Sequence, residues 1–261
     1  MGQGKEVRFM TKIMKYEILR SKVTLIALFG VLLGAEFVYL VGVMLKKDST
    51  MSLGIIFLIL AAGASFFTVW LQGLTGFRKD LTDKTGYMVF LTPVSPYRII
   101  IGKLLVALGE LVLASGLVAL LGSIDIRILY AKYETPMKII EKIAEFFGVT
   151  TSEVWAGFIV LVLTSMLSTL TLYAIAYLFS AVWAARFGTQ YSGKGASIVL
   201  VVAVLIIYYL IVLNLPTLSS TARNPVVRGF VEKLPRYIFY VIGTIGCTWG
   251  TGYLMDKKIS L

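Results

Sequence analysis

Six long apolar segments run through this chain and constrain its fold more than any other feature. They are Val23–Leu45, Leu53–Leu74, Ile99–Leu121, Val154–Trp183, Ala196–Leu215 and Tyr237–Met255. A helix needs about 20 apolar residues to cross the roughly 30 Å hydrocarbon core of a bilayer, and each segment is close to or above that length. We therefore expect an all-α membrane protein with six transmembrane helices, forming a single transmembrane domain over residues 1–261.

The composition agrees with lipid as the solvent of most of the chain. Of its 261 residues, 58% are hydrophobic and 15% charged, against about 45–50% and 25% in ordinary soluble domains. The chain has no histidine and one cysteine, Cys247, so an intrachain disulfide is impossible. Without histidine, zinc hydrolysis and Ser–His catalysis are poor expectations. We expect no catalytic residue and no metal site.

The net charge of +11 comes mainly from cations at the ends of the apolar segments. Lys and Arg prefer the cytoplasmic side of a membrane, and the majority fall on that side when the N-terminus is placed inside. On the cytoplasmic side these cations can interact with anionic lipid headgroups. This accounts for the positive net charge, so nucleic-acid binding is not expected. We predict a multi-pass protein of the plasma (cytoplasmic) membrane with both termini cytoplasmic.

Two amphipathic segments favour helices that lie along the membrane surface. In residues 1–22, one helical face carries cations and another carries apolar side chains. The cations are Lys5, Arg8, Lys12 and Lys15, and the apolar residues are Phe9, Met10, Ile13, Met14 and Ile18. We expect an interfacial helix on the inner leaflet, with a solvated leader as the alternative. A second short amphipathic helix is expected at Pro136–Phe147, in the outer loop between spans three and four.

The cytoplasmic link between spans two and three, residues 76–98, has an unusual order of parts. A charged piece, Arg78–Lys84, precedes an apolar piece, Tyr87–Leu91. The sequence Thr92-Pro93-Val94-Ser95-Pro96 follows, and its two prolines favour an extended backbone. This order predicts a short amphipathic helix at the inner surface, joined to span three by a stiff elbow that transmits force.

This link resembles the coupling-helix region of ABC-2 type permeases, the membrane subunits of ABC exporters. The resemblance rests on Leu91-Thr92-Pro93-Val94-Ser95 and on Ile101-Gly102-Lys103-Leu104-Leu105, which opens span three. At the level of sequence motifs the resemblance covers about 28 residues. At the level of architecture it covers the whole chain, including the basic N-terminus and the Lys257–Lys258 tail. The loop between spans three and four is longer than the family pattern implies.

The resemblance implies a separate ABC-type ATPase subunit, which would carry ATP and magnesium, and a second permease copy or related permease. The residues implied to contact the ATPase are Arg78, Lys79, Asp80, Asp83, Lys84 and Tyr87. The implied elbow consists of Thr92, Pro93, Ser95 and Pro96. A peptide or amphiphilic small molecule is the expected cargo. The alternative is an ordinary basic inner loop. Gly188–Gly195 resembles a phosphate-binding loop but lacks its final hydroxyl residue, so this chain itself is not expected to bind ATP.

Two carboxylates, Glu36 and Glu110, fall inside predicted spans, where a charge is costly. Two interpretations are open: the two glutamates line a polar pathway, or they are protonated and hydrogen-bonded to neighbouring helices. Family geometry implies a pathway lined by spans one, two and five. The aromatic residues Phe66, Phe67 and Trp70 are further pathway candidates. The alternative function is an ion- or proton-coupled secondary transporter or channel that uses both glutamates. A non-transporting, partner-binding membrane protein is a third possibility.

Small residues recur at helical spacing in three of the predicted spans. Examples are Gly30 with Gly34 in the first span and Gly246 with Gly250 in the sixth. Such pairs let helix backbones approach closely. They predict close packing within the helix bundle, or a contact between two copies of the chain.

Overall fold

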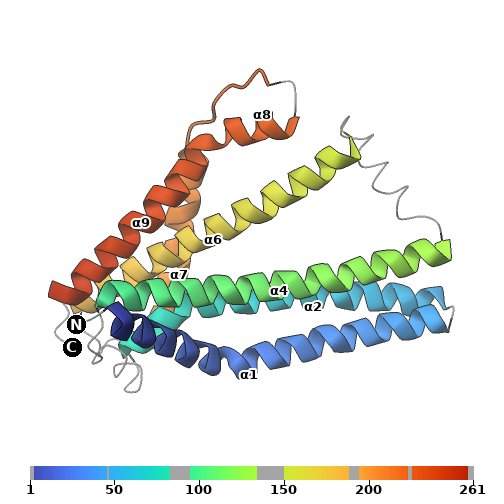
Figure 1. The fold of residues 1–261 in the computed structure, drawn as a ribbon, viewed down its shortest axis with the longest axis horizontal. Helices are drawn as coiled ribbons and strands as arrows, with labels where there is room; N and C mark the ends of the chain where they lie inside the picture. The colour runs from blue at the N-terminus through green and yellow to red at the C-terminus, as the bar shows by residue number, and fades with distance from the viewer. Residues whose placement is uncertain are drawn as a thin grey trace. The chain divides into compact units, whose positions relative to one another are not determined.

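The computed structural model describes residues 3–45, 47–82, 95–133, 150–187, 194–222 and 225–257, and all regular structure in these ranges is helical. The helices in the described ranges, shown in Figure 1, are α1 (Gln3–Met44), α2 (Asp48–Thr82), α4 (Pro96–Tyr133), α6 (Thr151–Phe187), α7 (Lys194–Asn214), α8 (Pro225–Glu232) and α9 (Leu234–Lys257). The all-α prediction is confirmed for this part of the chain.

Four of these helices are long and apolar enough to cross a membrane. The segments are Thr11–Met44, Ser49–Leu81, Pro96–Ile128 and Ile159–Arg186. Large apolar side chains on them remain exposed, such as Val23 at 76% and Phe37 at 68% of their surface, as expected for lipid-facing positions. The chain is therefore a plausible multi-pass membrane protein. The fifth and sixth predicted spans coincide with helices α7 and α9, and their crossing of the membrane stays a prediction.

The chain divides into two compact units. The first contains Met1–Gly73 and Val89–Leu121, and the second contains Leu74–Met88 and Gly122–Leu261. Helices α2 and α4 each contribute to both units, because a unit boundary falls within each of them.

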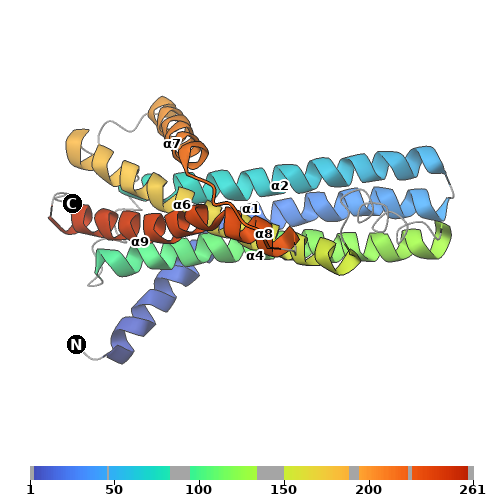
Figure 2. The same cartoon turned by 90° about the horizontal axis from the view of Figure 1, so that it is seen from above.

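In the first unit, α1, α2 and the adjoining part of α4 run side by side (Figures 1 and 2). Their apolar core includes Leu32 and Ala35 from α1, Ala61 from α2 and Leu121 from α4. These residues are small or unbranched at Cβ, which allows the three helices to pack closely. The core lies on one face of each helix and leaves the opposite face for lipid.

The backbones of α1 and α2 approach each other closely at two glycines. A Cβ added to Gly54 would lie 2.4 Å from Tyr39 Cα, and one added to Gly42 would lie 2.5 Å from the Met51 nitrogen. Neither position can accept a side chain without movement of the helices. A Cβ at Gly30 would meet nothing within 4 Å, so the prediction of close packing within the chain is wrong there.

Helix α1 is continuous from Gln3 to Met44, so the predicted interfacial segment and first span form one helix. Figure 2 shows that its first turns leave the direction of the rest at an angle. The Ser21 hydroxyl lies 3.2 Å from both the Glu17 and Ile18 carbonyl oxygens. Serine bonding to the preceding helical turn often bends a helix, which gives a local cause for the change of direction.

In the second unit, α6 packs along α9 and also contacts α7 and α8. The Thr171 hydroxyl joins α6 to α9, since it lies 3.0 Å from the Tyr240 carbonyl oxygen and 3.1 Å from the Thr244 hydroxyl. A Cβ added to Gly250 would lie 3.2 Å from Leu178 Cδ1. The predicted close approach therefore occurs at Gly250 but not at Gly246, where an added Cβ would meet nothing within 4 Å.

The start of α6 agrees with the local sequence, α8 was not predicted, and one predicted helix lies outside the described residues. Helix α6 begins at Thr151, where the Thr-Thr-Ser-Glu sequence at residues 150–153 predicts a start. Helix α8 was not predicted, although its apolar and polar residues alternate at helical spacing. The predicted outer-loop helix, Pro136–Phe147, lies outside the described residues.

Candidate functional site

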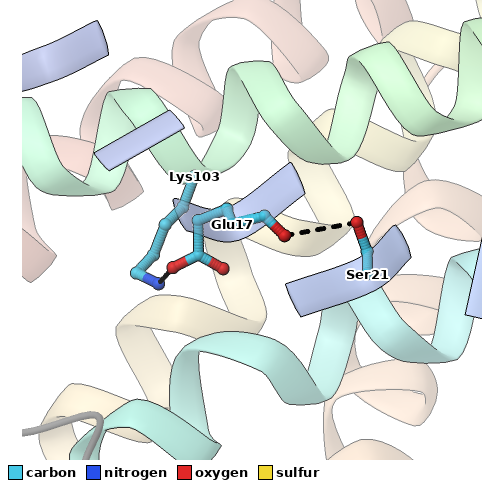
Figure 3. A network of polar contacts seen from close by, with 3 residues as sticks. All are labelled: Glu17, Ser21 and Lys103. Atoms are coloured by element: carbon cyan, nitrogen blue, oxygen red, sulfur yellow. Dashed lines mark hydrogen bonds and ion pairs between the residues drawn. The ribbon is translucent and has the colours of Figure 1, made fainter. Parts of the chain in front are cut away.

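The most distinctive polar cluster of the first unit joins α1 to α4. The Lys103 ammonium donates to Glu17 Oε1 in an ion pair, and Ser21 lies one turn further along α1 (Figure 3). The Lys103 side chain is 3% exposed and the Glu17 side chain 14%. An ion pair removed from solvent in this way is strongly coupled, because loss of either partner leaves the other charge buried.

Glu110 extends this cluster along α4. It lies seven residues after Lys103, on the same helical face, and is buried, at 7% exposure. Its side chain interacts with Ser21 and Glu17 of α1. Two carboxyl groups and one ammonium group therefore share a buried region between α1 and α4. Such a cluster can hold a proton or position the two helices electrostatically.

The sequence analysis singled out Glu110 but missed Glu17 and Ser21. A signal was present, since Ile13, Glu17 and Ser21 follow one another at four-residue spacing on α1. Ile13 and Ser21 are buried, at 6% and 1% exposure. Polar residues that continue an apolar stripe at this spacing indicate a buried polar contact.

Glu36 is buried too, at 6% exposure, but it lies apart from the cluster. It follows Ser21 by 15 residues along α1, which corresponds to about 22 Å at 1.5 Å per residue. Its neighbours on the buried face of α1 are Leu32, Ala35 and Tyr39. The two intramembrane glutamates therefore occupy different levels of the bundle and do not form one site.

The predicted ATPase-coupling residues fall partly on the last turns of α2. Here Arg78 and Asp80 are buried, at 5% and 0% exposure, while Lys79 is exposed. Phe77 is fully buried, and its ring stacks on Tyr177 of α6 with centroids 4.7 Å apart. The end of α2 is thus packed within the second unit. The remaining coupling residues, Asp83, Lys84 and Tyr87, lie outside the described residues.

The predicted elbow is described at its final two residues. Pro96 is the first residue of α4, a position that tolerates proline because its missing N–H would have no helical partner. The backbone N–H groups of Arg98 and Ile99 donate to the Ser95 carbonyl at 3.0 and 3.4 Å. Thr92 and Pro93 lie outside the described residues.

The aromatic pathway candidates lie on the outer side of α2. Phe67 is 58% exposed, and its ring stacks on Trp70 with centroids 6.2 Å apart. Phe66 and Trp70 are half-buried. The buried face of α2 instead presents Ala61, Ser65 and Val69. Of the three, Phe67 therefore faces away from the core of this chain, toward lipid or another molecule.

Comparison of the chain with family models, with curated proteins and with solved structures finds no match. Within the described ranges, no group of three or more Cys, Asp and Glu side chains is placed to hold a metal ion.

Proposed function

We propose that this chain is the permease subunit of an ATP-driven ABC exporter, which moves a peptide or amphiphilic small molecule outward by alternating access. It would act with a second permease copy or a related permease, and with a separate ABC-type ATPase subunit that carries ATP and magnesium. The proposal combines the membrane-spanning helices with the resemblance of residues 76–103 to the coupling region of ABC-2 type permeases.

The observation that carries the proposal is the packing of the end of α2. Helix α2 has 35 residues and is therefore about 52 Å long, which exceeds the bilayer core by about 20 Å. Its last turns belong to the second unit, while residues 48–73 belong to the first. Phe77 fixes this end against Tyr177. A force applied to residues 83–94 would act directly on a helix that contributes to both units.

Burial assigns different roles to the neighbouring charges. Arg78 and Asp80 are enclosed, so in the proposal they hold the end of α2 in place. Lys79 is exposed and would contact the ATPase, together with Asp83, Lys84 and Tyr87. In the proposal, the exposed Lys79 offers a partner an accessible charge next to a packed helix end.

The proposal is tested by purification of the tagged full-length chain from its native membrane with mild detergent. We expect a P-loop ATPase to co-purify, and K79E combined with D83K to reduce its recovery at least tenfold. K22E is the matched control, because Lys22 is also exposed and predicted to be cytoplasmic. Equal recovery of the ATPase with all three proteins, or recovery of none with the unmodified chain, would contradict the proposal.

An ion- or proton-coupled secondary transporter is the second candidate, and the burial of Glu36 and Glu110 favours it. Their separation along the bundle argues against one shared ion site, so each would have to act at its own level. Transport that persists without any ATPase, follows an imposed pH gradient and is abolished by E36Q would support this candidate. If transport requires the ATPase and E36Q only slows export of a cationic cargo, the result would support the exporter proposal.

A further inference from the structure

The second unit contains a cavity that none of the features above uses. It has a volume of about 400 Å³ and lies among α6, α8 and α9. This is within the range of roughly 300–1,000 Å³ found for small-molecule sites. Two of its lining residues, Gly157 and Gly229, have nothing within 4 Å of an added Cβ. The cavity therefore has open space on both its α6 and α8 sides.

One side of the cavity is lined by hydroxyl groups of α6. Thr164, Ser165 and Ser168 all contribute to the lining. The Thr164 hydroxyl lies 3.1 Å from the Tyr237 hydroxyl of α9, and Ser168 is hydrogen-bonded to Tyr208 of α7. These bonds fix the positions of the hydroxyl groups, while the exposed Ser165 is accessible to a ligand.

The rest of the described lining is mainly aromatic and apolar. The Phe230 ring of α8 stacks on Tyr237 of α9 with centroids 4.9 Å apart, and the buried Tyr240 continues this wall. Val160 and Leu161 of α6 complete the apolar lining. Small-molecule sites are lined predominantly by apolar and aromatic side chains, which here would accommodate an alkyl chain or ring.

The charge of the cavity is positive. Lys233 lines it and is exposed, in the short turn between α8 and α9. Arg236 follows three residues later, in the first turn of α9, and its Nε atom is buried without a hydrogen-bond partner. Among the lining residues whose side chains the structure describes, none is acidic. An anionic group is therefore the head group that this end of the cavity favours.

We propose that this cavity binds a single-chain anionic amphiphile, with its head group at Lys233 and its alkyl chain against the Phe230–Tyr237 wall. Under the predicted topology the turn between α8 and α9 lies on the outer side of the membrane, so the ligand would enter from the outer leaflet. The site belongs to this chain alone and would bind whether or not an ATPase is associated.

The test uses the purified full-length chain in nanodiscs of zwitterionic lipid and a dansyl-labelled undecanoate as the fluorescent probe. We expect saturable binding that is displaced by tetradecyl phosphate but not by tetradecyltrimethylammonium. Displacement by tetradecanoate as well would show that carboxylate and phosphate head groups share the site. Displacement by only one of them would identify the head group that the site prefers.

Two pairs of variants locate the site. K233Q should weaken binding about tenfold through loss of a charge-assisted hydrogen bond, while R228Q, which removes an exposed cation outside the lining, should leave it unchanged. G229L should block the cavity, whereas G246L fills open space elsewhere and should not. Neither leucine is expected to unfold its helix, because leucine has a higher helix propensity than glycine.

Three results would overturn the proposal. The first is binding that never saturates, which indicates partition into lipid. The second is equal displacement by anionic and cationic amphiphiles. The third is unchanged affinity in both K233Q and G229L when their melting temperatures match that of the unmodified chain. None of these results bears on association with an ATPase, so this proposal and the exporter proposal fail independently.

Discussion

The helices of the two units are held together by different kinds of side-chain contact. In the first unit, α1 and α4 are joined by the charged pair Glu17–Lys103, and α1 approaches α2 through glycines. In the second unit, α6 and α9 are joined by neutral hydroxyl groups such as that of Thr171. Charged pairs couple two helices tightly, whereas single hydroxyl bonds in membrane proteins contribute little each. The first unit should therefore be far more sensitive to single substitutions.

Among the substitutions considered, removal of the Lys103 charge should lower the free energy of unfolding the most. K103M leaves Glu17 buried without its cation, which we expect to cost about 3–5 kcal/mol of unfolding free energy. The double variant E17M/K103M should recover most of this loss, because no unpaired charge remains. Unfolding of the detergent-purified chain measures both, with K22M as the control for loss of an exposed cation. If K103M were as stable as E17M/K103M, the buried ion pair would not make the first unit more sensitive to substitution than the second.

A methyl group at the α1–α2 contact should have the next largest effect. G54A places a Cβ 2.4 Å from Tyr39 Cα, and the resulting overpacking is expected to cost about 1–3 kcal/mol. G63A is the matched control in the same helix, since its Cβ would meet nothing within 4 Å. It should be neutral or slightly stabilising. Equal melting temperatures for G54A and G63A would contradict the close approach of the two backbones.

Loss of the interhelical hydroxyl in the second unit should have the smallest effect. T171V keeps the shape of the side chain but removes its bonds to Tyr240 and Thr244, at a cost of about 0.6 kcal/mol and at most about 1.7 kcal/mol. T169V is the control, because the Thr169 hydroxyl bonds within its own helix, to the Ser165 carbonyl at 2.8 Å. If T171V destabilised the chain as strongly as K103M, the contrast between the units would disappear.

Several features of the candidate site could be predicted from the sequence, and the physical reason is local in each case. Glu110 stands out because a carboxyl group in an apolar run is costly in lipid. Pro96 marks the start of α4 because proline fits the first helical turn. The burial of Arg78 and Asp80 next to the exposed Lys79 was not predictable, because it depends on which face of α2 packs within the second unit.

The sequence by itself determined that this chain is helical and built for a membrane, because lipid leaves backbone groups no partners except those within a helix. Its apolar segments located the long helices, but α1 begins 20 residues before the predicted span, α2 ends eight residues after it and α4 ends 12 residues after it. Only the tertiary structure decided which polar residues meet. Glu17 and Lys103 are 86 residues apart in the chain, and the cavity of α6, α8 and α9 draws on residues from 157 to 240. Such contacts depend on how the helices pack together, which no local pattern in the sequence specifies.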